Sequence, residues 1–167
     1  VFVRKHTVYV DQSGKVEDLT MNTGLAFSDE SGNDYSNAVF ISKRHKKKLK
    51  SAAKKELGNL SEYRVKLFSV GLFMLIQNDI HRIKEIRIDQ EYEGKLKQIK
   101  HHLTNYLENN TEISSENYPK LTTCLVHEEL NEPECHDLAY RAREKELEHL
   151  LESNYDFLKA MILKSNK

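Results

Sequence analysis

The order of strand-like and helix-like segments is the feature that most limits how this chain can fold. Three strand-like segments come first, at residues 6–10, 24–27 and 37–42, and the turn-forming run Asp11-Gln12-Ser13-Gly14 closes the first of them. Short apolar and β-branched segments that are bounded by Gly, Asn, Asp and Ser residues predict strands joined by hairpins. Three such strands in succession predict an antiparallel meander.

Helix-like and strand-like segments alternate in the rest of the chain. Apolar residues recur at helical spacing between residues 61 and 78, and Ser61 is suited to cap the start of that helix. The later segments are expected as strands at 85–88 and 121–126 and as helices at 94–107, from Pro133 onward and at 155–163. The alternation predicts an α/β fold with a mixed five-stranded sheet, in which strands four and five run parallel to strand one and helices cover both faces.

Length and composition indicate one domain over residues 1–167. A chain of 167 residues can bury one proper core, whereas two cores would each be marginal. The longest apolar run, at residues 70–76, is far shorter than the ~20 residues of a membrane helix, so no membrane partner is expected. Two cysteines, Cys124 and Cys135, and the lack of an apolar signal segment predict reduced thiols and a cytoplasmic protein.

The charges are balanced overall but separated along the chain. The formal net charge is zero, although proteins that bind phosphates usually carry a basic excess. Residues 43–55, which we call the basic segment, contain eight cations and no acid, whereas residues 108–137 are rich in acids. These cations are Lys43, Arg44, Lys46, Lys47, Lys48, Lys50, Lys54 and Lys55. The pattern predicts separate basic and acidic surfaces, and a solvated helix face is the plainer reading of the basic segment.

Four acids stand where the predicted elements would bring them together. Asp11 and Asp89 each close a strand, and because the first and fourth strands are expected to be neighbours, their carboxylates are expected side by side. Glu62 shares a helical face with Val65, so its carboxylate is expected to face the sheet. Asp137, in the first turn of the helix from Pro133, would complete the group. Clustered carboxylates repel one another or take up protons unless a cation neutralises them, which predicts a metal site.

A structural role is also open to each acid taken alone. An aspartate that closes a strand before Ser-Gly is commonly a turn residue, and acids near a helix start, such as Glu62 and Asp137, favour the helix dipole. Their joint placement on four expected elements favours a site. Cys124 and Cys135 have no companion Cys-X-X-Cys pair, so no zinc site is expected.

The segments that carry these acids resemble the ribonuclease H-like superfamily, which includes ribonucleases H, Holliday-junction resolvases and several exonucleases. They are Val8-Tyr9-Val10-Asp11-Gln12-Ser13-Gly14, Leu60-Ser61-Glu62-Tyr63, Ile86-Arg87-Ile88-Asp89-Gln90 and Glu134-Cys135-His136-Asp137-Leu138-Ala139. The resemblance implies that Asp11, Glu62, Asp89 and Asp137 hold two Mg²⁺ or Mn²⁺ ions. Some resolvase relatives carry a histidine near the last acid, which makes His136 a secondary candidate.

The activity that the resemblance implies is metal-dependent hydrolysis of nucleic acid phosphodiesters, of DNA or RNA. Two divalent ions can activate a water and stabilise the attacking and leaving oxygens. Asp11 would bridge the ions, Glu62 would complete one coordination shell, and Asp89 with Asp137 would complete the other. The residues expected to hold the substrate's phosphates, without reading its sequence, are Lys46, Lys47, Lys48 and Lys50.

Two alternatives remain open at this level. A non-catalytic domain that binds nucleic acid or protein could keep the same fold without the metals, because fold does not settle function. An enzyme that transfers phosphate from a nucleotide is not favoured, because the chain has no glycine-rich phosphate loop. A resolvase-like enzyme would also act as a symmetric homodimer.

Overall fold

The computed structural model describes residues 5–30, 35–92, 94–130 and 133–163. In these ranges the strands form one six-stranded sheet in the order β5-β4-β1-β2-β3-β6. The strands are β1 (His6–Ser13), β2 (Thr23–Asp29), β3 (Ser36–Ile41), β4 (Ile83–Asp89), β5 (Lys120–Cys124) and β6 (Leu151–Glu152). The predicted α/β fold with a mixed sheet is confirmed, but the predicted number of five strands is wrong.

The pairing of the strands follows the prediction up to the last one. β1 pairs antiparallel with β2, and β2 with β3, so the meander is confirmed. β4 runs parallel to both β1 and β5. The additional strand β6 pairs with β3 through only two residues, Leu151 and Glu152, which are both exposed. So short a strand has no alternation of apolar and polar residues by which the sequence could reveal it.

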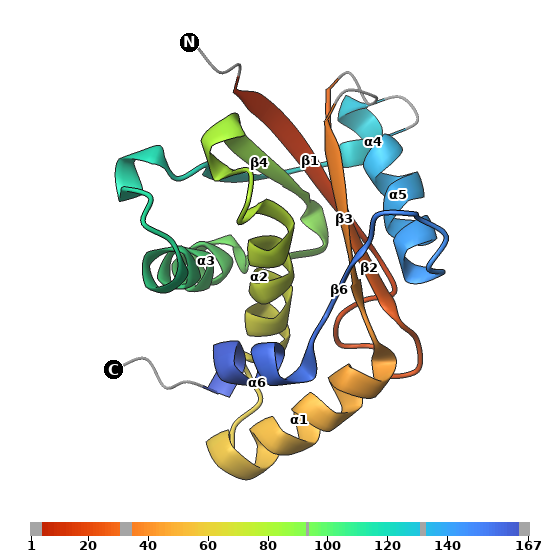
Figure 1. Cartoon of the computed structure of the whole chain (residues 1–167), viewed down its shortest axis with the longest axis vertical. Coiled ribbons are helices and arrows are strands. Elements are labelled where there is room, and N and C mark those ends of the chain that lie inside the picture. Colours follow the sequence, from red (N-terminus) through yellow and green to blue (C-terminus); the bar gives the residue numbers. More distant parts are fainter. Residues whose placement is uncertain (1–4, 31–34, 93, 131–132, 164–167) are drawn as a thin grey trace.

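Helices cover both faces of this sheet (Figure 1). The helices of the described ranges are α1 (Lys43–Leu57), α2 (Tyr63–Ile76), α3 (Leu96–Asn110), α4 (Val126–Glu129), α5 (Glu134–Arg143) and α6 (Tyr155–Leu163), with single 3₁₀ turns η1 (Ile80–Arg82), η2 (Gln90–Tyr92) and η3 (Ser115–Asn117). α2, α3 and α6 lie on one side, and α4 and α5 on the other. In the described ranges no helix combines the length and the apolar character that crossing a membrane requires.

The main core lies between the sheet and α2, which is buried along almost its whole length. A helix that is apolar and buried on nearly all sides is stable only when other elements surround it. Val10 of β1 and Ile88 of β4 point into this core. Since neighbouring residues of a strand point to opposite faces, Asp11 and Asp89 point to the face that α4 and α5 cover.

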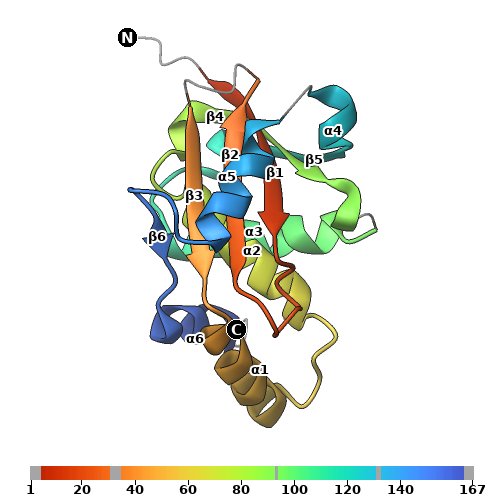
Figure 2. The ribbon, with the colours of Figure 1, turned by 90° about the vertical axis from the view of Figure 1, so that its right-hand side faces the viewer.

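Close contact between α5 and β2 fixes the second face, and α5 lies in front of β2 in Figure 2. Gly24 makes this contact possible, because a Cβ atom there would meet the backbone oxygen of Ala139 and would lie 2.6 Å from the backbone nitrogen of Arg143. Ala26 of β2 packs against Ala142 of α5 in the same interface. The small residues therefore hold α5 tightly on the sheet, with its first turn above β1.

Candidate metal centre

Asp11 is the most buried acid of the site, with 5% of its side chain exposed. Its Oδ1 accepts a hydrogen bond of 2.8 Å from the backbone N–H of Gln12. Its Oδ2 lies 2.7 Å from Nδ1 of His136, which is the third residue of α5 and has a side chain that is 60% exposed. A buried carboxylate is costly unless each oxygen has a partner, and these two contacts supply partners and fix its orientation.

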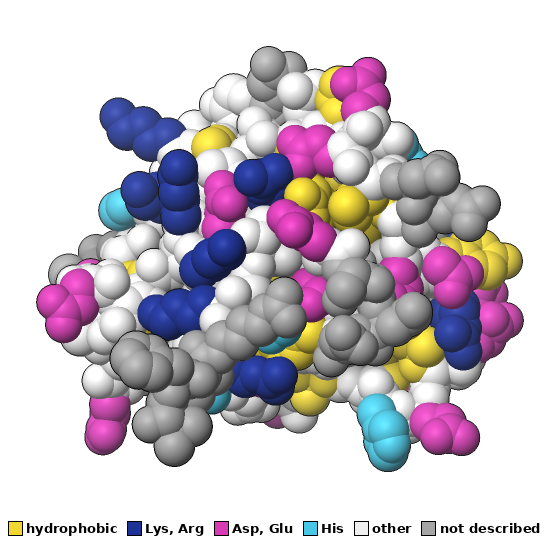
Figure 3. All heavy atoms as spheres, turned by 90° about the horizontal axis from the view of Figure 1, so that it is seen from above, with side chains coloured by type: hydrophobic (Ala, Val, Ile, Leu, Met, Phe, Trp, Pro, Cys, Tyr) yellow, Lys and Arg dark blue, Asp and Glu magenta, His cyan; other side chains and the backbone are white. Residues whose placement is uncertain are grey.

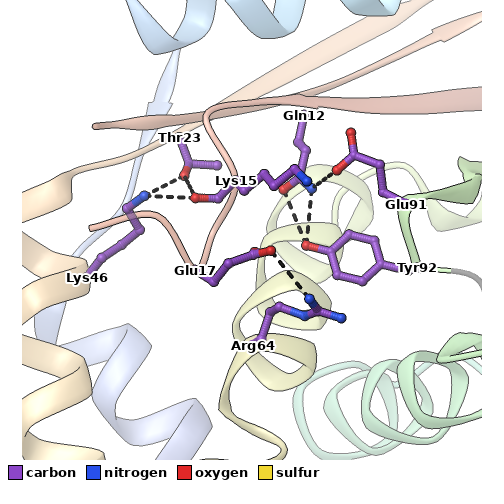
Figure 4. Close-up of polar contacts among 8 residues, drawn as sticks. All are labelled: Gln12, Lys15, Glu17, Thr23, Lys46, Arg64, Glu91 and Tyr92. Carbon is purple, nitrogen blue, oxygen red and sulfur yellow. Dashed lines mark hydrogen bonds and ion pairs between the residues drawn. The ribbon is translucent and has the colours of Figure 1, made fainter. Parts of the chain in front are cut away.

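Asp89 and Glu91 bring two further carboxylates to Asp11. Asp89 ends β4, the parallel neighbour of β1, and its Oδ1 accepts a hydrogen bond of 2.9 Å from the backbone N–H of Gln90. Glu91 follows in η2, where its Oε2 accepts a hydrogen bond of 2.8 Å from Nε2 of Gln12 (Figure 4). One carboxylate oxygen from each of Asp11, Asp89 and Glu91 lies within 4.8 Å of the other two. We call these three residues the oxygen group.

Tyr92 ties the oxygen group to the core. Its hydroxyl lies 3.1 Å from Nε2 of Gln12, and its ring packs on Phe68 of α2 with a centroid distance of 4.2 Å. Burial raises the pKa of Tyr92, so its hydroxyl keeps its proton. Arg64 lies over the same ring and forms an ion pair of 3.4 Å with Glu17 (Figure 4). Contacts of the Tyr92 ring with Phe68 and Arg64 thus hold η2 in place. A small cavity lies between Asp11, Asp89 and Tyr92.

A second group of ligand atoms also includes Asp11. Nitrogens of His127 and His136 and an oxygen of Asp11 lie within 4.8 Å of one another, and we call these residues the histidine group. The two imidazole rings have a centroid distance of 5.0 Å and an interplanar angle of 72°. Both histidines are exposed, whereas Asp11 is buried. Asp11 is therefore the residue that links the two groups.

The helix that carries His127 is held on the sheet by Glu129. Oε2 of Glu129 accepts hydrogen bonds from Arg87 at 2.6 Å and from the Tyr9 hydroxyl at 3.1 Å. Burial and the hydrogen bond to Glu129 raise the pKa of Tyr9 to about 12, so the hydroxyl remains a donor. Val126, next to His127, is fully buried. These contacts fix α4 and with it the position of His127.

Glu62 does not join either group in the described part of the chain. It is the N-cap residue of α2, its side chain is 54% exposed, and its Oε2 lies 3.9 Å from Nε2 of His102 on α3. The predictions that Ser61 caps this helix and that Glu62 faces the sheet are both wrong. The helix begins only at Tyr63, so Glu62 precedes the helical face to which the sequence pattern assigned it.

Asp137 also stays apart from the two groups among the described residues. Its side chain is 66% exposed and its Oδ2 lies 3.9 Å from a guanidinium nitrogen of Arg141. Successive residues of a helix are rotated by about 100°. Because His136 points to Asp11, its neighbour Asp137 points to solvent, and the secondary candidate His136 is the residue of α5 that contacts Asp11.

Glu91 and His127 are the members of the two groups that the sequence did not single out. Glu91 stands two residues after Asp89 in the loop that closes β4, and this spacing could have drawn attention to it. His127 was hidden because residues 121–126 read as one strand, whereas β5 ends at Cys124 and α4 begins at Val126.

Lys46 is fully buried, so the expectation that it holds a substrate phosphate is wrong. Its Nζ donates hydrogen bonds to the backbone carbonyl of Lys15 and to Oγ1 of Thr23 (Figure 4). It also donates a hydrogen bond to the backbone carbonyl of Asp18. Burial lowers the pKa of Lys46 to about 8. The side chain thus fastens α1 to the loop between β1 and β2.

The other three lysines that were expected to bind phosphates, Lys47, Lys48 and Lys50, are exposed on α1. Nζ of Lys48 lies 4.2 Å from the ring centroid of Tyr155. Basic side chains also gather over one half of the face at the opposite end of the molecule from α1, where acidic side chains lie among them (Figure 3). The basic surface is therefore not confined to the basic segment.

The two groups offer different chemistry to a cation. The oxygen group consists of carboxylates, which Mg²⁺ and Mn²⁺ prefer, whereas the histidine group adds imidazole nitrogens, which suit Zn²⁺ and other transition metals.

Comparisons with protein family models, with curated proteins and with solved structures find no match to this chain. The arrangement around Asp11 is thus the observation from which a function can be argued.

Proposed function

We propose that this protein is a divalent-metal-dependent nuclease that hydrolyses phosphodiester bonds of DNA or RNA at the oxygen group. The observation that carries the proposal is the convergence of Asp11, Asp89 and Glu91, whose ligand oxygens lie within 4.8 Å of one another. Asp11 and Asp89 come from neighbouring parallel strands and Glu91 from the turn that follows β4. Mg²⁺ or Mn²⁺ would be the resident ion, because both favour carboxylate oxygens.

The oxygen group fits such an ion. Three carboxylates this close repel one another when they are all charged, and Asp11 is buried. The backbone N–H groups of Gln12 and Gln90 each hold one oxygen of the neighbouring aspartate. In the described ranges the second oxygen of Asp89 has no hydrogen-bond partner, so it remains available to a cation.

The topology of the sheet supports a ribonuclease H-like assignment. β1 lies between antiparallel β2 and parallel β4, and β5 continues the parallel side. This is the meander with two added parallel strands that the order of elements predicts, and that order is part of the resemblance. The resemblance also implies two bound ions and, for a resolvase-like enzyme, a symmetric homodimer, and both stay predictions.

Each residue of the site has a task in the proposed hydrolysis. A divalent ion held by the oxygen group would activate a water and stabilise the charge that develops on the phosphate oxygens. Asp11, Asp89 and Glu91 would bind that ion, and Gln12 would orient Glu91 through its 2.8 Å hydrogen bond. Nδ1 of His136 lies 2.7 Å from Oδ2 of Asp11 and would orient this carboxylate toward the ion.

One observation favours the non-catalytic alternative, a nucleic-acid-binding or protein-interaction domain with a degenerate site. Glu62 and Asp137, which the resemblance made metal ligands, are exposed and pair with His102 and Arg141 instead. Glu91 offers the third carboxylate that Glu62 does not supply. An enzyme is the better proposal because the oxygen group keeps three ligands without them.

A cleavage assay separates the two functions. The purified chain is incubated with labelled single-stranded DNA, junction DNA and RNA in Mg²⁺, in Mn²⁺ and with a chelator. We expect cleavage with either metal, none with chelator, and losses of about 100-fold or more for Asp11→Asn and Glu91→Gln, since lost charge stabilisation of a few kcal/mol corresponds to such a factor.

Glu62→Gln and Asp137→Asn serve as matched controls, because each also removes one carboxylate charge but lies outside the oxygen group. We expect both to keep the parent's rate. Cleavage by Asp11→Asn at the parent's rate would exclude this site, and the absence of cleavage with every substrate and metal would favour the non-catalytic domain.

A further inference from the structure

The histidine group has properties of a metal site of its own, distinct from the oxygen group. It combines one buried carboxylate, from Asp11, with two exposed imidazoles, from His127 and His136. The sequence predicted no zinc site because its cysteines lack a suitable pattern, but the ligands here are histidines from α4 and α5. We propose that Asp11, His127 and His136 bind a first-row transition-metal ion, with Zn²⁺ as the best-fitting one.

The distances suit ligands of one ion. Nδ1 of His136 and Oδ2 of Asp11 are 2.7 Å apart, and a nitrogen of His127 lies within 4.8 Å of a ligand atom of each. Two ligands that each bind zinc at about 2.0–2.2 Å lie about 3.3–3.6 Å apart when they are adjacent in a tetrahedral coordination shell. Small shifts of the two exposed imidazoles would therefore bring all three atoms onto one ion, which would replace the proton between His136 and Asp11.

A simple hydrogen bond accounts for only part of this arrangement. The contact of His136 with Asp11 satisfies the buried carboxylate without any metal. It gives no reason for the second imidazole, whose ring lies 5.0 Å from that of His136. A role as a metal ligand accounts for the position of His127. Two imidazoles and one carboxylate would give a zinc ion three protein ligands and leave the fourth coordination position open, as in catalytic zinc sites.

Each of the three ligands is held by an element that is itself fixed. Asp11 is held by the backbone N–H of Gln12. The salt bridge of 2.6 Å between Arg87 and Glu129 fixes the helix of His127. Contact with Gly24 fixes the helix of His136. Ligands that are already in place lose little freedom when they bind an ion, so the site would bind without refolding.

The chemistry of the ligands determines which ion they would select. Imidazole suits Zn²⁺, Cu²⁺, Ni²⁺ and Fe²⁺, whereas Mg²⁺ demands oxygen ligands and keeps much of its water. The histidine group would thus accept a different ion from the oxygen group, with Asp11 placed between them. It would bind metal whether or not the chain cleaves nucleic acid, so this proposal and the nuclease proposal fail separately.

Titration of the metal-free chain with Zn²⁺ tests the inference, by calorimetry and by the visible spectrum of Co²⁺ as a substitute ion. We expect one tightly bound Zn²⁺ per chain and an affinity at least about tenfold lower in His127→Ala and His136→Gln. Glutamine at position 136 keeps a hydrogen-bond donor for Asp11, and His127 is exposed, so both variants should fold, as thermal unfolding without metal will verify.

Two control variants establish that zinc binding depends on the histidine group itself. His81→Ala deletes an exposed histidine of η1 outside both groups, and Asp89→Asn alters only the oxygen group. Both should bind Zn²⁺ as the parent does, whereas Asp11→Asn should weaken it. The proposal is overturned if the parent binds no Zn²⁺, or if His127→Ala binds it as tightly as His81→Ala does. Zinc binding without cleavage in any metal would exclude the nuclease proposal and support the zinc site. Mg²⁺-dependent cleavage without zinc binding would support the nuclease proposal and exclude the zinc site.

Discussion

At the scale of single residues, Asp11 is the central side chain because it belongs to both groups of ligands. The sequence predicted that Asp11 and Asp89 each close a strand and lie side by side. Asp89 is the last residue of β4, but Asp11 lies within β1, which continues to Ser13. The two carboxylates still come together as predicted, because β1 and β4 are parallel neighbours. Glu62 and Asp137 could not be predicted in the same way. Their side-chain directions depend on where a helix begins, and an error of one residue turns a side chain by about 100°.

His102 should make the fold sensitive to acid. It is 4% exposed, its Nε2 has no hydrogen-bond partner among the described residues, and burial lowers its pKa, with Lys66 and His101 acting in the same direction and Glu62 opposing them. In the unfolded chain His102 binds a proton as the pH falls through about 6.5, whereas in the folded chain it stays neutral to a lower pH. The free energy of unfolding therefore decreases as the pH falls below about 6.5. Urea unfolding at pH 7 and pH 5 should show a smaller loss of stability in His102→Leu than in the parent. Equal losses in both chains would exclude His102 as the cause.

At the scale of elements, alternation predicted the five longer strands and the helices α2, α3, α5 and α6, because each has several turns or alternating residues that face a core. β6 and α4 have only two and four residues and leave too little pattern to detect. The position of α5 on the sheet was hidden for another reason. It depends on Gly24 and small residues around it, which carry no periodic signal.

Gly24→Ala should displace α5. The added methyl group would collide with the backbone of Ala139 and Arg143, and overpacking of this kind costs about 1–3 kcal/mol. Gly71→Ala is the matched control, because its methyl would contact only side-chain atoms, the nearest being of Leu25 at 3.1 Å, and alanine favours a helix by roughly 0.5–1 kcal/mol. Urea unfolding should show a loss of stability for Gly24→Ala alone. If both variants match the parent, the tight packing does not position α5.

At the scale of the whole molecule, the site and the basic helix α1 are connected through one loop. Asp11 lies on β1, and the loop that follows β1 accepts the hydrogen bonds of Lys46 from α1. The sequence predicted a basic region next to the site, but it could not separate Lys46, which stabilises the loop, from the exposed lysines around it. Burial of a single lysine depends on the packing of α1 and not on local composition.

Exposed lysines of α1 should contribute to nucleic acid binding. Lys47, Lys48 and Lys50 changed together to Gln should weaken binding and reduce the slope of log affinity against log salt by about 0.7–0.9 for each phosphate that the variant no longer neutralises. Changing Lys84, Lys97 and Lys100, which are exposed elsewhere, removes the same charge and serves as the control. Equal effects of the two triple variants on the slope would mean that α1 has no special part in binding.

The central claim is that the oxygen group holds the ion that cleaves phosphodiester bonds. It is tested most directly by the cleavage rate of the parent and of Asp89→Asn, purified identically, over a titration of Mn²⁺. Asparagine can still accept the hydrogen bond from Gln90 that Asp89 accepts, so the fold should be kept while a charged ligand is lost. We predict a rate that rises to saturation with Mn²⁺ in the parent and is about 100-fold lower in Asp89→Asn. Equal rates in the two chains at every Mn²⁺ concentration would contradict the claim.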